Sequence, residues 1–336
     1  MNMIKRIHQD TLSCEATFRI APDGHYIIVS QCGGPSEPHP DNRVYIFHSY
    51  DQGKTWSEPK LIIQENGLSQ YQTEVSVVDN EIIVFMGESD GNFCNFHAYA
   101  ISSLDNGQTF KKKFDLPLLD GFCFVRGTIK IGEEYLFPYQ HYPISKKEND
   151  DLHKQQLKIW EGDTNIVEMG LLRTKDFKHF EISKKPAILK MICGDKKRWV
   201  WSEPTVVPVE DKLIMFLRYD WRGFLYKSES FDNGYTWSEP VETNIPNPNN
   251  KPKAIKWNNH IVLLNTPQSE CGFAHRNPLA IWVSDDGENW YYKKNIVNLK
   301  GWISYPDGVI YNNELLFAFE YNRKDIYFVK HKLKII

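Results

Sequence analysis

The chain repeats one hydrophobic pattern six times along its length. In each copy an apolar run rich in β-branched and aromatic residues leads into a short polar turn, and a second apolar run follows. Runs of this kind around Asp-Gly, Asp-Asn or Asn-Asn turns predict tight antiparallel hairpins. The six copies are RIAPDGHYIIVSQ (19–31), VSVVDNEIIVFMGE (75–88), TIKIGEEYLFPYQ (128–140), TVVPVEDKLIMFLR (205–218), KAIKWNNHIVLLNT (253–266) and DGVIYNNELLFAFE (307–320).

The turns recur at nearly regular intervals, which is typical of propellers and other repeat architectures. One long interval contains a lysine-rich stretch, Ser145 to Lys158, and predicts an insertion on one face of the molecule. The intervals are 56, 53, 79, 47 and 54 residues when they are counted between Asp23, Asp79, Gly132, Asp211, Asn258 and Asn312.

A second signature, Ser-x-Asp-x-Gly-x-Thr-aromatic, follows five of the hairpins. It is complete in SYDQGKTW (49–56), SLDNGQTF (103–110) and SFDNGYTW (230–237), shortened in SDDGENW (284–290) and degenerate in TKDFKHF (174–180). The aspartate can accept N–H groups of its own turn, the glycine supplies a positive φ, and the aromatic ring can pack between sheets. We therefore expect a structural role, and neither catalysis nor calcium binding, for Asp51, Asp105, Asp232 and Asp286.

The repeat predicts an all-β fold. Two hairpins per unit make a four-stranded antiparallel sheet, and six units make a six-bladed β-propeller that uses residues 1–336 as a single domain. The last unit ends in one further strand, KDIYFVKHKLKII. We expect the N-terminal segment around Leu12 to Ala16 to pair with that strand and close the ring, because an open array would leave two exposed edges.

Composition argues against several classes of partner. The formal net charge is −3, from 40 Lys and Arg against 43 Asp and Glu, so no nucleic-acid partner is expected. The six cysteines form no Cys-x-x-Cys pair, which indicates neither a metal site nor a disulfide framework. The chain has no apolar segment of membrane-spanning length and no apolar run of a signal peptide. We expect a cytoplasmic protein without a cofactor, although a chain trimmed of its signal would look the same.

Charged residues recur at the ends of the predicted hairpins. The first strand of a blade lines the channel, so the residue before it should lie at one rim. Converging guanidinium groups repel one another unless an anion or buried carboxylates compensate them, so an anionic ligand is expected, with a polar, water-filled channel as the alternative. The rim positions are Arg19, Glu74, Arg126, Glu203, Lys253 and Tyr305, joined by Gln31, Glu88, Gln140, Arg218 and Glu320 at second-strand ends and by Glu37, Asp41 and Arg276 in loops.

These residues give the chain a resemblance to the sialidase (neuraminidase) superfamily over essentially its whole length. Two copies of the Ser-x-Asp-x-Gly-x-Thr-aromatic signature, which is called the Asp box, contribute to the resemblance: SYDQGKTW and SFDNGYTW. The other segments are TFRI, SEP with Arg218 after it, and GWISYPDGVIYNNELLFAFEYNRKDIYFV. The resemblance implies a six-bladed propeller. The box is more specific for the fold than for the activity.

The resemblance also implies roles for individual residues. Arg19, Arg218 and Arg276 match the arginine triad that clamps the carboxylate of a sialic acid. Tyr305 in ISYP matches the nucleophile, and Glu203 matches the base that takes its proton. Such a base is needed because a phenol with a pKa of about 10 is a poor nucleophile.

The general acid of the family lies in a loop of the first blade, which reads CGGPSEPHPDNR here. Asp41 is the first candidate and Glu37 the second, with two solvated loop residues as the alternative. Glu74 and Arg126 at the rim complete the expected substrate-binding set.

Together these features predict an exo-acting glycoside hydrolase of sialidase type that releases a terminal α-linked sialic acid, or a related acidic sugar, from a glycan. A retaining mechanism through a tyrosyl intermediate is implied by the resemblance. One alternative is a glycan-binding propeller without catalysis. The other is a hydrolase or lyase for a uronate- or rhamnose-containing glycan that uses His141 or Tyr305 as its acid/base.

Overall fold

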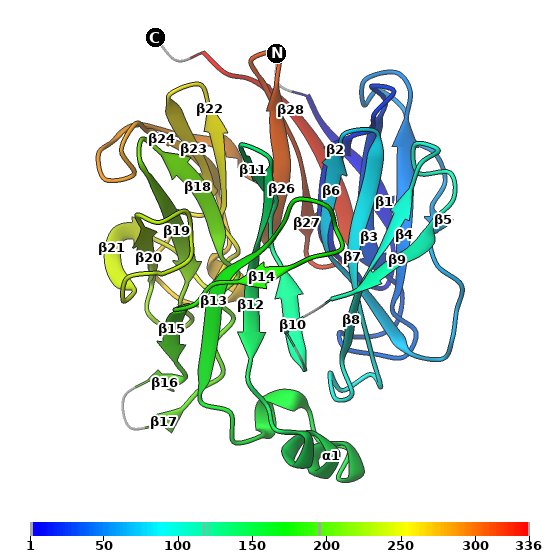
Figure 1. The fold of residues 1–336 in the computed structure, drawn as a ribbon. Helices are drawn as coiled ribbons and strands as arrows, with labels where there is room; N and C mark the ends of the chain where they lie inside the picture. Colours follow the sequence, from blue (N-terminus) through cyan, green and yellow to red (C-terminus); the bar gives the residue numbers. More distant parts are fainter. Residues whose placement is uncertain (1–2, 117, 120, 194–195, 335–336) are drawn as a thin grey trace.

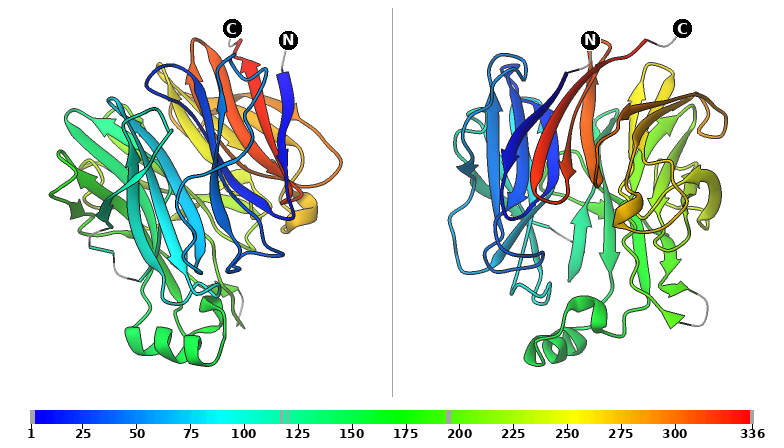
Figure 2. Two further views of the ribbon diagram at one scale, coloured as in Figure 1. Left: turned by 90° about the vertical axis from the view of Figure 1, so that its right-hand side faces the viewer. Right: turned by 180° about the vertical axis from the view of Figure 1, so that it is seen from behind.

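The computed structural model describes residues 3–334 except 117, 120, 194 and 195. Six antiparallel sheets stand around a central channel, and the three views show them as neighbouring blades (Figures 1 and 2). Five sheets have four strands and one has six. The predicted six-bladed β-propeller is confirmed.

We number the blades one to six in chain order. The first strands of neighbouring blades contact each other and line the channel. Blade one holds β2 (Ser13–Ile20), β3 (Tyr26–Cys32), β4 (Arg43–Ser49) and β5 (Lys60–Leu61), and blade two holds β6 (Ser69–Val78), β7 (Glu81–Ser89), β8 (His97–Ser103) and β9 (Lys111–Asp115). Blade three holds β10 (Phe122–Val125), β11 (Ile129–Ile131), β12 (Glu134–Tyr142), β13 (Ile166–Thr174), β14 (Glu181–Ile182) and β15 (Ala187–Lys190), and the pair β16 (Ile192–Cys193) and β17 (Lys196–Lys197) follows it.

The second half of the ring repeats the same order of strands. Blade four holds β18 (Thr205–Val209), β19 (Lys212–Arg218), β20 (Phe224–Ser230) and β21 (Val241–Pro246), and blade five holds β22 (Lys253–Trp257), β23 (His260–Asn265), β24 (Leu279–Ser284) and β25 (Trp290–Val297). Blade six holds β26 (Ile303–Tyr311), β27 (Glu314–Tyr321), β28 (Asp325–Lys332) and, as its outer strand, β1 (Met3–Gln9).

All six predicted hairpins are confirmed, as β2–β3, β6–β7, β11–β12, β18–β19, β22–β23 and β26–β27. In β6–β7 Val78 pairs with Glu81, so only two residues form the turn. Asp79 and Asn258 have φ values of 52° and 53°, a left-handed conformation that Asp and Asn tolerate better than most residues.

The ring closes through a different segment from the predicted one. β1 (Met3–Gln9) pairs antiparallel with β28, whereas Leu12 to Ala16 leads into β2, the inner strand of blade one. The expected pairing of Leu12 to Ala16 is therefore wrong, although the N-terminus does supply the closing strand. The apolar side chains of that segment are buried, which suits an inner strand and not an outer edge.

The complete Ser-x-Asp-x-Gly-x-Thr segments form the turns between the third and fourth strands of their blades. Asp51 Oδ1 accepts the Thr55 N–H at 2.8 Å, and Oδ2 accepts the Thr55 hydroxyl at 2.7 Å. Gly53 has a φ of +87° and packs so closely on Phe328 that a Cβ would clash. The Trp56 ring, 5.4 Å from that of Phe328, packs between blades one and six. These contacts are structural.

One insertion interrupts the repeat, between β12 and β13. It carries α1 (Lys146–Lys154) and the 3-10 helix η1 (Ile159–Glu161), and α1 projects beyond the ends of the blades at the bottom of Figure 1. A second 3-10 helix, η2 (Phe273–His275), lies between β23 and β24. No helix in the described part of the chain has the length and apolarity to cross a membrane.

Candidate active site

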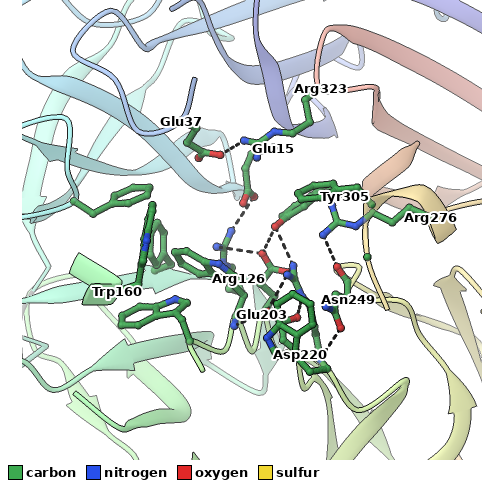
Figure 3. A pocket seen from close by; sticks show the side chains of 18 residues that line it. Glu15, Glu37, Arg126, Trp160, Glu203, Asp220, Asn249, Arg276, Tyr305 and Arg323 are labelled. Atoms are coloured by element: carbon green, nitrogen blue, oxygen red, sulfur yellow. Dashed lines mark hydrogen bonds and ion pairs between the residues drawn. The ribbon is translucent and has the colours of Figure 1, made fainter. Parts of the chain in front are cut away.

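A cavity of about 340 Å³ lies at the end of the channel where the inner strands begin. This volume is within the range of small-molecule sites. Charged side chains meet at its centre and aromatic rings form one side (Figure 3). Every blade contributes to the lining, which consists of Glu15, Glu37, Phe93, Phe124, Arg126, Trp160, Trp199, Trp201, Glu203, Arg218, Asp220, Trp221, Asn249, Gly272, Phe273, Arg276, Tyr305 and Arg323.

Tyr305 and Glu203 are in direct contact. The Tyr305 hydroxyl donates to Glu203 Oε1 at 2.5 Å, and Arg218 Nη1 donates to the same hydroxyl oxygen at 3.1 Å. Burial alone would raise the pKa of Glu203, but Arg218 and Arg126 hold it at about 2. Burial and then the charge of Glu203 raise the pKa of Tyr305 well above its usual range. The resting pair is a neutral phenol beside a carboxylate that can accept its proton.

Arg218 is held by two carboxylates. Its Nη1 lies 2.6 Å from Glu203 Oε2, and its Nε and Nη2 donate to Asp220. Asp220 also accepts the backbone N–H of Trp201 at 3.1 Å. The sequence interpretation missed Asp220. Asp220 lies in the turn that follows β19, and its position only two residues after Arg218 was the signal that could have revealed it.

Arg126 joins two carboxylates across the cavity. Its Nη1 lies 2.8 Å from Glu15 Oε2, and its Nη2 lies 3.9 Å from Glu203 Oε1. Lys251 Nζ lies 3.3 Å from the same Glu15 oxygen. Arg126 is therefore at the rim, as expected, whereas the sequence interpretation missed Glu15 and Lys251.

Arg276 differs from the other arginines of the cavity, because none of the carboxylates that the structure describes forms an ion pair with it. Its Nη1 donates to Ser304 Oγ at 3.1 Å and its Nη2 to the Asn249 carbonyl, while Nε is buried without a partner. Burial and then the charge of Arg218 lower the pKa of Arg276 to about 10. The group stays cationic at neutral pH, with an unmatched charge at the cavity wall.

Of the two predicted general acids, the structure places only Glu37 in the cavity. Glu37 forms an ion pair with Arg323, and burial raises the pKa of Glu37 in spite of that partner. The Asp41 side chain is 70% exposed, lies 3.4 Å from His39 Nδ1 and is not part of the lining. Asp41 is a solvated loop residue, which was the alternative left open for it.

Arg19 and Glu74 lie deeper in the channel and do not line the cavity. Arg19 contacts both Glu74 and Asp307, and Lys253 Nζ lies 2.6 Å from Asp307 Oδ2. Arg19 and Lys253 instead line a cavity of about 650 Å³ at the opposite end of the channel, where the inner hairpins turn. The expectation that Arg19 joins Arg218 and Arg276 in one clamp is corrected by this placement.

The register of β2 is the physical reason. Arg19 is four residues beyond Glu15 in the direction of the hairpin turn, so it lies deeper in the channel. A β-bulge between Cys14 and Thr17 interrupts the alternation of side chains between the two residues, and both reach the channel but at different depths. Glu15, and not Arg19, lines the cavity with Glu203 and Tyr305.

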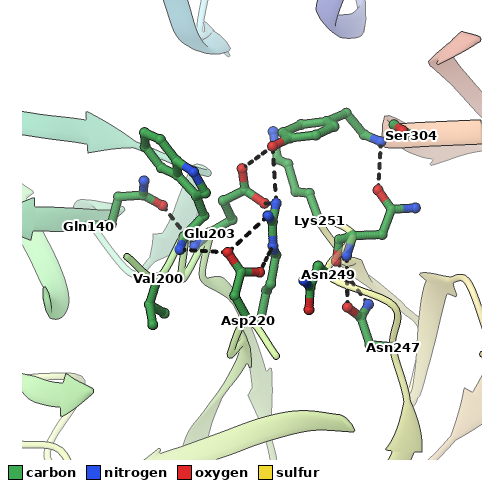
Figure 4. A network of polar contacts seen from close by, with 12 residues as sticks. Gln140, Val200, Glu203, Asp220, Asn247, Asn249, Lys251 and Ser304 are labelled. Atoms are coloured by element: carbon green, nitrogen blue, oxygen red, sulfur yellow. Dashed lines mark hydrogen bonds and ion pairs between the residues drawn. The ribbon is translucent and has the colours of Figure 1, made fainter. Parts of the chain in front are cut away.

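Backbone contacts fix the charged centre, and Figure 4 shows the part around Glu203. The Glu203 N–H donates to Gln140 Oε1 at 2.8 Å, and Gln140 also accepts from Arg126 Nε at 3.4 Å. The Tyr305 N–H donates to Asn250 Oδ1 at 3.3 Å. Side chains of neighbouring blades thus hold the two residues at the required positions.

The aromatic wall of the cavity consists of Phe93, Phe124, Trp160, Trp199 and Trp201. The insertion brings Trp160 to this wall on η1, with ring centroids 6.4 Å from Trp201 and 6.1 Å from Phe93. Flat apolar walls beside a few polar groups are typical of sites for small organic ligands.

Comparison with known proteins identifies the family. A family model described as a BNR repeat-like domain matches residues 24–317. The chain belongs to the BNR repeat-like family. No curated protein matches its sequence significantly.

Solved structures share the fold of this chain at low sequence identity. The Hadza microbial sialidase Hz136 has a TM-score of 0.74 and 15% identity over 98% of this chain and 68% of its own. The NanB sialidase from Streptococcus pneumoniae has a TM-score of 0.70 and 13% identity over 97% and 69%. An α-L-arabinanase from Penicillium chrysogenum, complexed with arabinobiose, has a TM-score of 0.65 and 12% identity over 100% and 99%. Likenesses at this identity show the fold alone.

Two further groups of this BNR propeller lie away from the cavity. His141, a possible acid/base by sequence, has its Nδ1 3.1 Å from Glu168 Oε2 on β13 and is not part of the lining. Within the described residues, one group of three side chains with metal-ligand atoms occurs, His8, Asp10 and Cys32, and none of them lines the cavity.

Proposed function

We propose that the protein is an exo-acting glycoside hydrolase that releases a terminal acidic sugar, sialic acid or a related one, from a glycan. The hydrogen bond between Tyr305 and Glu203 in the cavity carries this proposal. The Arg276 guanidinium carbon lies 5.7 Å from the centre of the Tyr305 ring, so an anion bound there would lie next to the phenol. Glycosidases among the proteins of the same fold support the reaction class.

In the first step the Tyr305 oxygen attacks the anomeric carbon and the bond to the leaving oxygen breaks. Glu203 takes the phenol proton, and Glu37 donates a proton to the leaving oxygen. In the second step Glu37 removes a proton from water, which displaces the tyrosyl oxygen, and Glu203 returns its proton to Tyr305. Two displacements at one carbon give retention of configuration.

Arg276 would hold the acidic group of the sugar. An unpaired, buried guanidinium gains more from an incoming carboxylate than one that already has a carboxylate partner. Arg218, in contrast, already contacts Glu203 and Asp220. Its proposed role is to stabilise the phenolate that forms at Tyr305.

A second candidate is a hydrolase for a neutral sugar, such as a terminal arabinose. The observation that favours it is the balance of charge, because the lining contains four arginines (Arg126, Arg218, Arg276 and Arg323) and four carboxylates (Glu15, Glu37, Glu203 and Asp220). In that case Glu203 and Glu37 or Glu15 would act as a pair of carboxylates.

Turnover of fluorogenic glycosides tests the proposal. We expect the wild type to release the fluorophore from an α-sialoside or an α-uronide. In Tyr305→Phe the rate of this release should fall by at least about 10³-fold. Tyr311→Phe is the matched control, because Tyr311 lies on the same strand but is 52% exposed at the hairpin turn. Turnover of an α-L-arabinofuranoside alone would favour the neutral-sugar candidate. Glycan binding without turnover of any substrate would favour a binding protein.

A further inference from the structure

We propose that Glu15 is a substrate-contacting residue that accepts a hydroxyl of the bound sugar and restricts the acidic group of the ligand to the Arg276 side of the cavity. The inference rests on the proposed function as far as the ligand is a sugar. Neither the repeat nor the resemblance to sialidases pointed to this position.

The first argument is a backbone feature that Glu15 shares with the two proposed catalytic residues. Glu15, Glu203 and Tyr305 lie at the cavity ends of three inner strands and have φ values of 55°, 38° and 55°. This left-handed conformation is unfavourable for residues with long side chains. Such outliers persist where the surroundings hold them, and they cluster at functional sites.

The second argument is how the three residues are held. Each has its N–H bound by a side chain from outside its own blade. The Glu15 N–H donates to Glu320 Oε2 of blade six at 3.1 Å. Gln140 of blade three and Asn250, just before blade five, do the same for Glu203 and Tyr305. The same backbone conformation and the same type of N–H contact thus direct the side chains of Glu15, Glu203 and Tyr305 into the cavity. A chemical role is already proposed for Glu203 and Tyr305.

The third argument is the free acceptor capacity of Glu15. Arg126 and Lys251 both contact Oε2, at 2.8 and 3.3 Å. No side chain or backbone group of the described residues donates to Oε1, and the carboxylate is 12% exposed, next to the cavity. The oxygen of the carboxylate that these cations leave unused can accept a hydrogen bond. A sugar hydroxyl has the matching chemistry.

The charge of Glu15 also sets the specificity. It forms ion pairs with both Arg126 and Lys251 and offsets part of their charge, and without it these two cations would attract the anionic group of a ligand more strongly to their own side of the cavity. With Glu15 in place, Arg276 is the cation of the lining that lacks a carboxylate partner. A ligand is therefore oriented with its acidic group at Arg276 and its hydroxyls toward Glu15.

Calorimetric binding of galacturonate and of its neutral methyl ester tests this role in the wild type and in Glu15→Gln. We expect the ratio of the two affinities to shift toward galacturonate by roughly 10-fold in Glu15→Gln, because a charged partner of Arg126 and Lys251 is lost. Lys251→Met should shift the ratio in the opposite direction. Glu81→Gln, which alters a surface pair with Lys113, should leave it unchanged.

An unchanged ratio in both Glu15→Gln and Lys251→Met would overturn the proposal, because a merely structural Glu15 would weaken both ligands equally. If the wild type binds neither sugar, inorganic sulfate replaces the sugars as the probe, and turnover of the fluorogenic glycosides alone decides the proposed function. Tighter sulfate binding by Glu15→Gln than by the wild type would still support the charge role, and equal binding would refute it. Thermal unfolding of each variant verifies that it is folded.

Discussion

The channel holds two groups of buried charges that differ in how completely they are compensated. In the inner group, Arg19 contacts Glu74 and Asp307, and Asp307 also contacts Lys253, so two cations meet two carboxylates. The remaining donors of Arg19 bind main-chain carbonyls, with Nε 2.6 Å from the Val75 oxygen. This group satisfies itself and needs no ligand.

The outer group surrounds the 340 Å³ cavity and is left incomplete. Arg276 contacts only neutral acceptors and keeps an unpaired Nε, and Glu320 has a buried oxygen without a partner. Buried polar atoms without partners are rare in stable structures and mark places where another molecule binds or chemistry occurs. The comparison shows that a charged residue in the channel does not by itself indicate a binding site. The charges around it distinguish the two cases: a structural ion cluster has all its charges paired, whereas a site keeps an unpaired one.

The largest expected effect concerns the acid of the outer group. Glu37→Gln should lower turnover of substrates with poor leaving groups by roughly 10² to 10⁴-fold, because the leaving oxygen would receive no proton. Asp41→Asn, in the same loop but exposed, should leave turnover unchanged. Steady-state kinetics with leaving groups of different pKa measures both. A large loss in Asp41→Asn with normal activity of Glu37→Gln would reverse the assignment.

Substitution of one arginine in each group compares how much the two groups contribute to the free energy of unfolding. Arg19→Met leaves Glu74 and Asp307 without their shared partner and should lower the free energy of unfolding by roughly 3–5 kcal/mol. Arg276→Met should change it by less than about 1 kcal/mol, since the lost hydrogen bonds are offset by relief from the charge of Arg218. Urea unfolding measures both values, and equal losses would contradict the distinction between the groups.

Between pH 4.5 and 8, the change of the free energy of unfolding with pH should come from Glu320 of the outer group. Burial raises the pKa of Glu320 from 4.5 to about 7 in the folded state, in spite of Arg323 and Arg276. Its contribution, on the order of 3 kcal/mol, is fully present below pH 4.5 and is lost as the pH rises through 7. Glu320→Gln should remove this dependence.

The inner group provides the control for that measurement. Arg19 and Lys253 hold the pKa of Asp307 below its usual value although burial opposes them. Its contribution is therefore present above the unfolded pKa of 3.8 and is lost only as the pH falls below it. Asp307→Asn should lower stability without changing the slope between pH 4.5 and 8. An identical slope in wild type and Glu320→Gln would contradict the prediction.

The smallest expected effect comes from the aromatic wall. Trp160→Ala should raise KM by roughly 2- to 10-fold with little change in kcat, because it removes stacking area from the aromatic wall and leaves the arginines and carboxylates of the lining in place. Trp257→Ala is the control, since Trp257 lies on the inner strand of blade five at the opposite end of the channel. A change of kcat alone would show that Trp160 positions the charged centre instead.

The sequence by itself determined the architecture. Each hairpin is specified by residues close together in the chain. Five of the six have a two-residue turn between apolar runs, so the turns at Asp79, Asn258 and Asn312, which all have positive φ, could be predicted one at a time. The same holds for the turn around Asp51, whose carboxylate bonds within its own segment. The positions of Tyr305 and Glu203 at the rim were also predicted from the hairpin pattern, and their proposed roles from the resemblance to sialidases.

Only the tertiary structure decided which charged residues meet. The hairpin pattern places Arg19 on a predicted inner strand, but it does not show the β-bulge between Cys14 and Thr17 that lets Glu15 reach the channel four residues earlier. How deep each side chain lies in the channel depends on how β2 packs against β27 and β6, two strands of neighbouring blades that belong to distant parts of the sequence. Glu15 therefore lines the cavity, Arg19 joins Asp307 in the inner group, and Trp160 arrives on an insertion. Charge compensation is a property of neighbours in space, and the folded ring alone fixes those neighbours.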